Sequence, residues 1–129
     1  MTKEQYALEW LQYAENDLEA GRFLLGMVPL PVEIICFHCQ QTAEKALKAF
    51  LAHNGTSVPK THDLPNLNEL CAGHNIDIES LAEQCIALND YAVEIRYPGK
   101  LPIEEEDAKK AVKDAEVILD YVQTRLKHE

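Results

Sequence analysis

Apolar side chains recur at steps of three and four residues along most of the chain, which is the period of amphipathic α-helices. The first stripe consists of Ala7, Leu11, Ala14, Leu18, Gly21 and Leu25. Trp10 and Phe23 are expected to widen it. Thr2 and Gln5 have the spacing of a capping box, and Gly26 is a natural stop, so the pattern predicts a helix between them.

A second stripe lies between Pro31 and Gly55 and is made of Ile35, Cys36, Cys39, Ala43, Ala46, Leu47 and Phe50. Pro31 suits the first turn of a helix, because the N–H that proline lacks has no partner there. Asn54 and Gly55 suit a left-handed C-terminal stop. We therefore predict a long helix that ends at this pair.

Three further helices are predicted downstream. A short helix begins at the N-cap Asp63, ends at Gly73 and carries Leu64, Leu67, Leu70 and Cys71. A longer helix starts at about Ile78, ends before Pro98 and has the stripe Ile78, Leu81, Cys85, Leu88, Ala92 and Ile95. The last helix opens with acids at 104–107, where the helix dipole favours them, and buries Ala108, Ala111, Val112, Ala115, Ile118, Leu119, Val122 and Leu126.

No strand pattern, internal repeat or low-complexity tract interrupts these helices. A chain of 129 residues is large enough to bury one core without disulfides. We therefore expect a single all-α domain over residues 1–129, an up-and-down four-helix bundle with one additional short helix.

The chain is acidic, with a net charge of −10, which argues against general adhesion to nucleic acid or to anionic membranes. The charge is uneven. Residues 31–62 hold two acids and three lysines, so this segment is +1 and the remainder is −11. No stretch has the length of a membrane span and the N-terminus has no signal-peptide pattern, so we expect a cytoplasmic protein with reduced thiols.

Cys36 and Cys39 form a C-x-x-C pattern within the second predicted helix. A redox motif of this kind needs its first thiol at a helix N-terminus, and a metal site needs further ligands at suitable spacing. Neither condition is met, so both cysteines are interpreted as buried packing residues. The chain also lacks the Glu-x-x-His pattern of di-metal bundles, and no metal or cofactor is expected.

A polar stripe runs beside the apolar one on the second predicted helix and consists of His38, Gln41, Lys45 and Lys48. Its simplest interpretation is a solvated helix face. The stripe would also lie near the loop that carries His62, and near Arg96 and Tyr97 at the end of the fourth predicted helix. A groove rich in donors that also contains an aromatic ring could hold a phosphate and stack a base.

These residues resemble the HEPN family (higher eukaryotes and prokaryotes nucleotide-binding domain). The resemblance rests on Asp17-Leu18, the run from Phe37 to Leu51, Thr61-His62-Asp63-Leu64 and Arg96-Tyr97-Pro98, and it covers nearly the whole chain. It implies a homodimer. It also implies a two-component system, of the toxin–antitoxin kind, with a minimal nucleotidyltransferase as the partner.

Many HEPN proteins are metal-independent ribonucleases with an Arg followed, after four to six residues, by a His. Here Arg96 has no His at that spacing. The resemblance therefore favours a non-catalytic module that binds a nucleotide, a partner nucleotidyltransferase, or both. In this role Lys45, Lys48 and Arg96 would contact phosphate, His38, Gln41 and His62 would form hydrogen bonds, and Tyr97 would stack.

Two alternatives stay open. One is a ribonuclease that uses Arg96 with His38 or His62, although the acidic charge disfavours RNA. The other is a purely structural dimerisation or interaction protein, in which the polar stripe is an interface.

Overall fold

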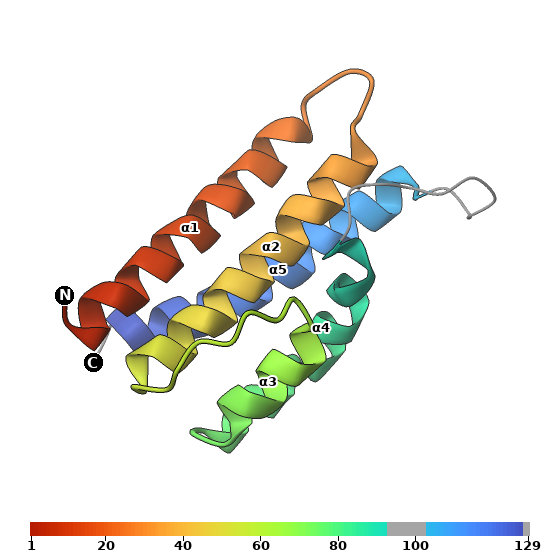
Figure 1. Cartoon of the computed structure of the whole chain (residues 1–129). Coiled ribbons are helices and arrows are strands. Elements are labelled where there is room, and N and C mark those ends of the chain that lie inside the picture. Colours follow the sequence, from red (N-terminus) through yellow and green to blue (C-terminus); the bar gives the residue numbers. More distant parts are fainter. Residues whose placement is uncertain (93–102, 128–129) are drawn as a thin grey trace.

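The computed structural model describes residues 1–92 and 103–127. Three long helices, α1 (Lys3–Leu24), α2 (Val32–His53) and α5 (Glu105–Lys127), lie side by side, and α3 (Leu64–Ala72) and α4 (Ala82–Asn89) form a shorter pair against them (Figure 1). Helix α2 packs against all four other α-helices. No strand occurs in these ranges, so the predicted all-α bundle is confirmed.

Helix α1 begins with the expected capping box. The Thr2 backbone N–H donates to Gln5 Oε1 at 2.8 Å, and the Gln5 N–H donates to Thr2 Oγ1 at 3.1 Å. The predicted stripe is buried as far as Gly21, and Leu25 packs at its edge. The prediction that Phe23 widens the buried stripe is wrong, because its side chain is exposed. At about 100° per residue it lies some 200° from Gly21, on the far side of the helix.

Helix α2 is more deeply buried than a one-sided stripe implies. Every residue from Ala46 to Ala52 is buried, because α2 is enclosed by its neighbours and not merely placed on a core. The alanines at 43, 46, 49 and 52 let those neighbours approach closely. The predicted C-terminal stop is confirmed: Gly55 has a φ of +76°, which a side chain would strain.

The two shorter α-helices differ in part from expectation. Asp63 caps α3 as predicted, accepting from the Asn66 N–H at 3.3 Å, but Leu70 is exposed. In place of one long helix from Ile78, the chain forms a 3-10 turn η1 (Ile76–Leu81), then α4, then a second turn η2 (Asp90–Ala92). Residues three apart also share a face in a 3-10 helix, so the apolar spacing does not separate the two forms. Residue Ile95 lies outside the described ranges.

Helix α5 starts and packs as predicted. The Glu104 N–H donates to Asp107 Oδ2 at 2.8 Å, and all eight predicted core residues of this helix are buried. Helix α5 runs parallel to α2 and antiparallel to α1, so the first residues of α1 and the last turn of α5 meet at one end of the bundle (Figure 1). None of the helices in the described ranges is both long and apolar enough to cross a membrane.

Candidate functional site

Asp17 on α1 joins two side chains of the polar stripe on α2. Its Oδ1 lies 2.9 Å from His38 Nδ1, and its Oδ2 lies 2.6 Å from Lys45 Nζ. All three side chains are half-buried. Because an ionised carboxylate can only accept hydrogen bonds, Nδ1 of His38 carries the hydrogen in this contact. In a neutral imidazole, Nε2 is then the acceptor.

An exposed aromatic ring completes this group of residues. Lys45 Nζ lies 5.9 Å from the centre of the Tyr13 ring, one helical turn before Asp17 on α1. We call Tyr13, Asp17, His38 and Lys45 the Asp17 cluster. It combines an aromatic face, a cation and an oriented imidazole, all of them at least partly exposed to solvent. The sequence pattern did not assign Tyr13 to the site, although Tyr13 and Asp17 are one turn apart and therefore share a face of α1.

Glu44 forms a second, more buried group. Its Oε1 lies 2.9 Å from His62 Nδ1, and its Oε2 lies 3.0 Å from Lys48 Nζ. Lys48 Nζ is also 5.5 Å from the centre of the Trp10 ring. We call Glu44, Lys48 and His62 the Glu44 cluster. The Lys48 side chain is buried and its ammonium is paired with Glu44, so it is less accessible to a phosphate than Lys45, whose side chain is partly exposed.

Two glutamines fix the loop before α3 to α2. Gln41 Nε2 donates to Gln40 Oε1 at 2.7 Å, and Gln40 Nε2 donates to the His62 carbonyl at 3.1 Å. Gln40 is fully buried. This side chain was absent from the predicted stripe, yet it holds His62 beside α2.

The structure thus brings five of the seven predicted site residues onto or beside one helix: His38, Gln41, Lys45, Lys48 and His62. The other two, Arg96 and Tyr97, lie outside the described residues. The acids Asp17 and Glu44 were not predicted to organise the site. Glu44 could have been found from its i,i+4 spacing to Lys48. Because the two acids offset the two lysines, neither cluster is an open patch of positive charge.

The interpretation of the C-x-x-C pattern as packing is confirmed. Cys36 and Cys39 are completely buried, and burial raises the pKa of the Cys39 thiol to about 12. A thiol of such high pKa is a poor nucleophile near neutral pH. Within residues 1–92 and 103–127, no three His, Cys, Asp or Glu side chains are grouped so that they could hold a metal ion.

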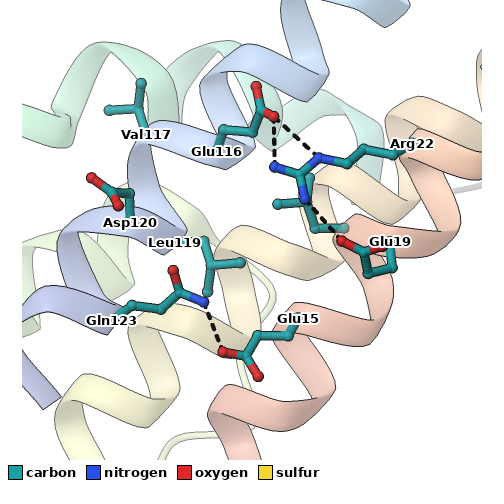
Figure 2. Close-up of a pocket in the computed structure, with 9 residues that line it drawn as sticks. Glu15, Glu19, Arg22, Glu116, Val117, Leu119, Asp120 and Gln123 are labelled. Carbon is teal, nitrogen blue, oxygen red and sulfur yellow. Dashed lines mark hydrogen bonds and ion pairs between the residues drawn. The ribbon is translucent and has the colours of Figure 1, made fainter. Parts of the chain in front are cut away.

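A separate hollow of about 530 Å³ lies between α1 and α5, and Figure 2 shows its walls. The Arg22 guanidinium spans it, 2.6 Å from Glu116 and 2.9 Å from Glu19, and the hydrogen bond to Glu116 raises the pKa of Arg22. Glu15 accepts from Gln123 at 2.7 Å. These polar groups satisfy one another, and none belongs to either cluster, so the hollow does not coincide with the candidate chemistry.

Comparisons with known proteins agree with this architecture. The HEPN domain family model matches residues 7–125. A curated relative from Methanocaldococcus jannaschii, named "Putative toxin MJ1304", is 32% identical over 140 residues, which span 95% of this chain and 90% of the relative.

Two solved structures are also similar. TT1696 from Thermus thermophilus has a TM-score of 0.77 and 29% identity, and the match covers 91% of this chain and 95% of that one. ST0689, described as an archaeal HEPN homologue, has a TM-score of 0.74 and 25% identity, with 93% and 97% covered.

Proposed function

The chain belongs to the HEPN domain family, and we propose that it is a non-catalytic HEPN module that binds a nucleotide at the Asp17 cluster and works with a nucleotidyltransferase partner. The observation that carries the proposal is the arrangement of Lys45 and His38 on one carboxylate beside an exposed ring. The toxin name of the relative supports a place in a two-component system.

Each member of the Asp17 cluster has a distinct role in this proposal. Tyr13 offers a face on which a base can stack. Lys45 has three N–H donors and gives one to Asp17, so others can reach a phosphate. His38 presents Nε2 to the ligand because its Nδ1 is held by Asp17.

The remaining predicted residues act around this centre. Gln41 extends the row of polar groups along α2, and His62 lies beside it on the loop that Gln40 holds. Lys48 acts through Glu44, which it neutralises and which in turn orients His62. From the sequence, Arg96 adds a second phosphate contact and Tyr97 a second stacking face.

Calorimetric titration of ATP and GTP into the purified chain tests the nucleotide part. Tyr13→Leu removes the stacking ring and should weaken binding about 10-fold or more. Lys45→Ala removes a charged donor and should weaken it about 10- to 100-fold. The matched control is Lys109→Ala, because Lys109 is an exposed lysine on α5 that also pairs with an acid.

Circular dichroism confirms that each variant is folded. The proposal fails if neither nucleotide binds the native chain, with or without the partner. It also fails if Lys109→Ala weakens binding as much as Lys45→Ala.

The partner is tested by co-expression with a minimal nucleotidyltransferase encoded beside this chain. A stable complex that survives size-exclusion chromatography supports the two-component proposal. The lack of such a neighbouring gene would remove its basis.

The geometry of His38 favours one second candidate. A carboxylate on Nδ1 makes Nε2 the acceptor of a neutral imidazole, which is the arrangement of a general base, so His38 could take a proton from an RNA 2′-hydroxyl. Cleavage of labelled RNA that persists in EDTA, and is lost in His38→Gln but retained in Lys109→Ala, would support this candidate. RNA that stays intact at high protein concentration excludes it.

A further inference from the structure

A second hollow, of about 330 Å³, lies between the 3-10 turn η1 and the C-terminal half of α5. A volume of this size is typical of sites that bind small molecules. None of its lining residues belongs to the Asp17 cluster or the Glu44 cluster. Helix α5 lines it with side chains that share one face, because they are three or four residues apart: Val117, Asp120, Tyr121, Thr124 and Arg125.

The opposite wall, on η1, is held in place by buried contacts. Ser80 and Leu81 form it, and the Leu81 side chain is only 2% exposed. In the same turn, the Ile78 carbonyl accepts a buried hydrogen bond from Asn68 Nδ2 at 2.9 Å. The hollow therefore has two ordered walls, as a binding site requires.

The Arg125 guanidinium is positioned without an acid partner. Its central carbon lies 3.5 Å from the centre of the Tyr121 ring, over which it is held. Arg125 forms no ion pair with any residue in the ranges 1–92 and 103–127, whereas Arg22 pairs with two acids. A guanidinium stacked on a ring keeps its N–H donors in a fixed fork, which matches a carboxylate. Arg125 can therefore receive a carboxylate from a ligand with little further ordering.

Asp120 adds a charge of the opposite sign to the same hollow. It is exposed, and within the described part of the chain it pairs neither with Arg125 nor with any other cation. A free phosphate would meet this carboxylate as a like charge, in a chain whose net charge is already −10. A simple cation would meet the guanidinium in the same way. Two opposite charges that line one hollow without neutralising each other instead suit a ligand that carries both.

The other lining residues indicate the rest of the ligand. Leu81 and Val117 are apolar, and Val117 is 45% exposed, so it is free to cover an apolar group. Ser80 and Thr124 contribute hydroxyl groups, which can donate or accept hydrogen bonds. Arg125 and Asp120 are the charged residues of this lining, and both are needed for the two charges of the ligand. A third charge on the ligand would have no partner there.

We propose that this hollow binds a free α-amino acid with a neutral aliphatic side chain. Arg125 holds its carboxylate, Asp120 accepts from its ammonium, and its side chain lies against Leu81 and Val117. Ser80 and Thr124 supply further hydrogen bonds to the two charged groups. This site is separate from the nucleotide site proposed at the Asp17 cluster and takes a different class of ligand.

Calorimetric titration of L-leucine, L-valine and L-methionine into the full chain tests the proposal. At least one of them should bind with a dissociation constant below about 1 mM. Arg125→Leu and Asp120→Asn should each weaken binding at least about 10-fold, because each removes one charged contact. The matched control is Lys113→Leu, which removes an exposed cation of α5 outside the hollow and should leave binding unchanged.

Derivatives of the bound amino acid test whether both of its charges are recognised. The N-acetyl derivative lacks the ammonium and the amide derivative lacks the carboxylate, so each should bind at least about 10-fold more weakly than the parent. In addition, Asp120→Asn should not weaken binding of the N-acetyl derivative further, because that derivative has no ammonium to lose. A variant that merely disturbed the fold would weaken both ligands.

Three results would overturn the proposal. The first is that none of the three amino acids binds the native chain at about 10 mM. The second is that Arg125→Leu and Asp120→Asn bind as well as Lys113→Leu, with circular dichroism showing all three folded. The third is that either singly charged derivative binds as tightly as its parent, which would point to a peptide terminus instead. Tyr13→Leu, which tests the nucleotide site, should leave amino-acid binding unchanged, so the two proposals fail independently.

Discussion

The Asp17 cluster and the Glu44 cluster each contain one carboxylate, one histidine and one lysine, but the environments of these side chains differ. Each contains a carboxylate that accepts from a histidine Nδ1 and a lysine Nζ. In the Asp17 cluster the histidine and lysine are 27% and 25% exposed. In the Glu44 cluster the histidine is 71% exposed and the lysine only 6%.

This difference in burial indicates that the two clusters have different roles. A buried ion pair fixes its neighbours, because breaking it leaves a charge away from water. A partly exposed ion pair can give up some of its hydrogen bonds and form new ones with a ligand. The buried Glu44–Lys48 pair therefore has a structural role in α2, whereas the Asp17 cluster keeps part of its polar surface open to solvent.

The largest effect is expected from breaking the buried pair. Glu44→Leu leaves the Lys48 ammonium buried without its carboxylate and should lower the free energy of unfolding by about 3–5 kcal/mol. The double variant Glu44→Leu/Lys48→Met should recover most of this loss, because no buried charge remains. Urea unfolding measures both. A single-variant loss below about 1 kcal/mol would contradict the structural role of this pair.

An intermediate effect is expected at Asp17. Asp17→Asn keeps the size of the side chain but weakens two charged contacts between α1 and α2, so it should lower the free energy of unfolding by about 1–3 kcal/mol. Because this cluster is half-open, the loss should shrink in 1 M salt, whereas that of Glu44→Leu should not. If salt reduced the loss in free energy of unfolding equally in Asp17→Asn and Glu44→Leu, the two clusters would not differ in electrostatic screening, which would contradict the difference in burial.

The smallest effect is expected at His62. Its side chain is mostly exposed, so His62→Ala should change the free energy of unfolding by less than about 1 kcal/mol. The loop should keep its position because Gln40 bonds the His62 carbonyl and not its ring. Gln40→Ala is the informative comparison. If His62→Ala destabilises the chain more than Gln40→Ala does, the ring has a structural role after all.

Much of the bundle follows from local pattern. The capping box at Thr2 and the left-handed stop at Gly55 depend on residues a few positions apart, which is why the sequence predicts them. The stripes of α1, α2 and α5 also follow from helical period. The helical period gives a wrong prediction at Ile76–Leu81, where the same apolar spacing also fits a 3-10 helix. It also does so at Phe23, whose ring lies outside the buried stripe of α1 and is exposed.

By itself the sequence determined the helices α1, α2, α3 and α5, and it placed His38, Gln41, Lys45 and Lys48 on one side of α2, because helical geometry relates residues three and four apart. It could not place Asp17, which is 21 residues from His38 and 28 from Lys45 in the chain. Nor could the sequence predict that the Lys45 side chain is partly exposed and the Lys48 side chain is buried. Only the packing of α1 and the His62 loop against α2 decided which lysine is buried and which stays partly exposed to solvent, because burial depends on neighbours distant in sequence.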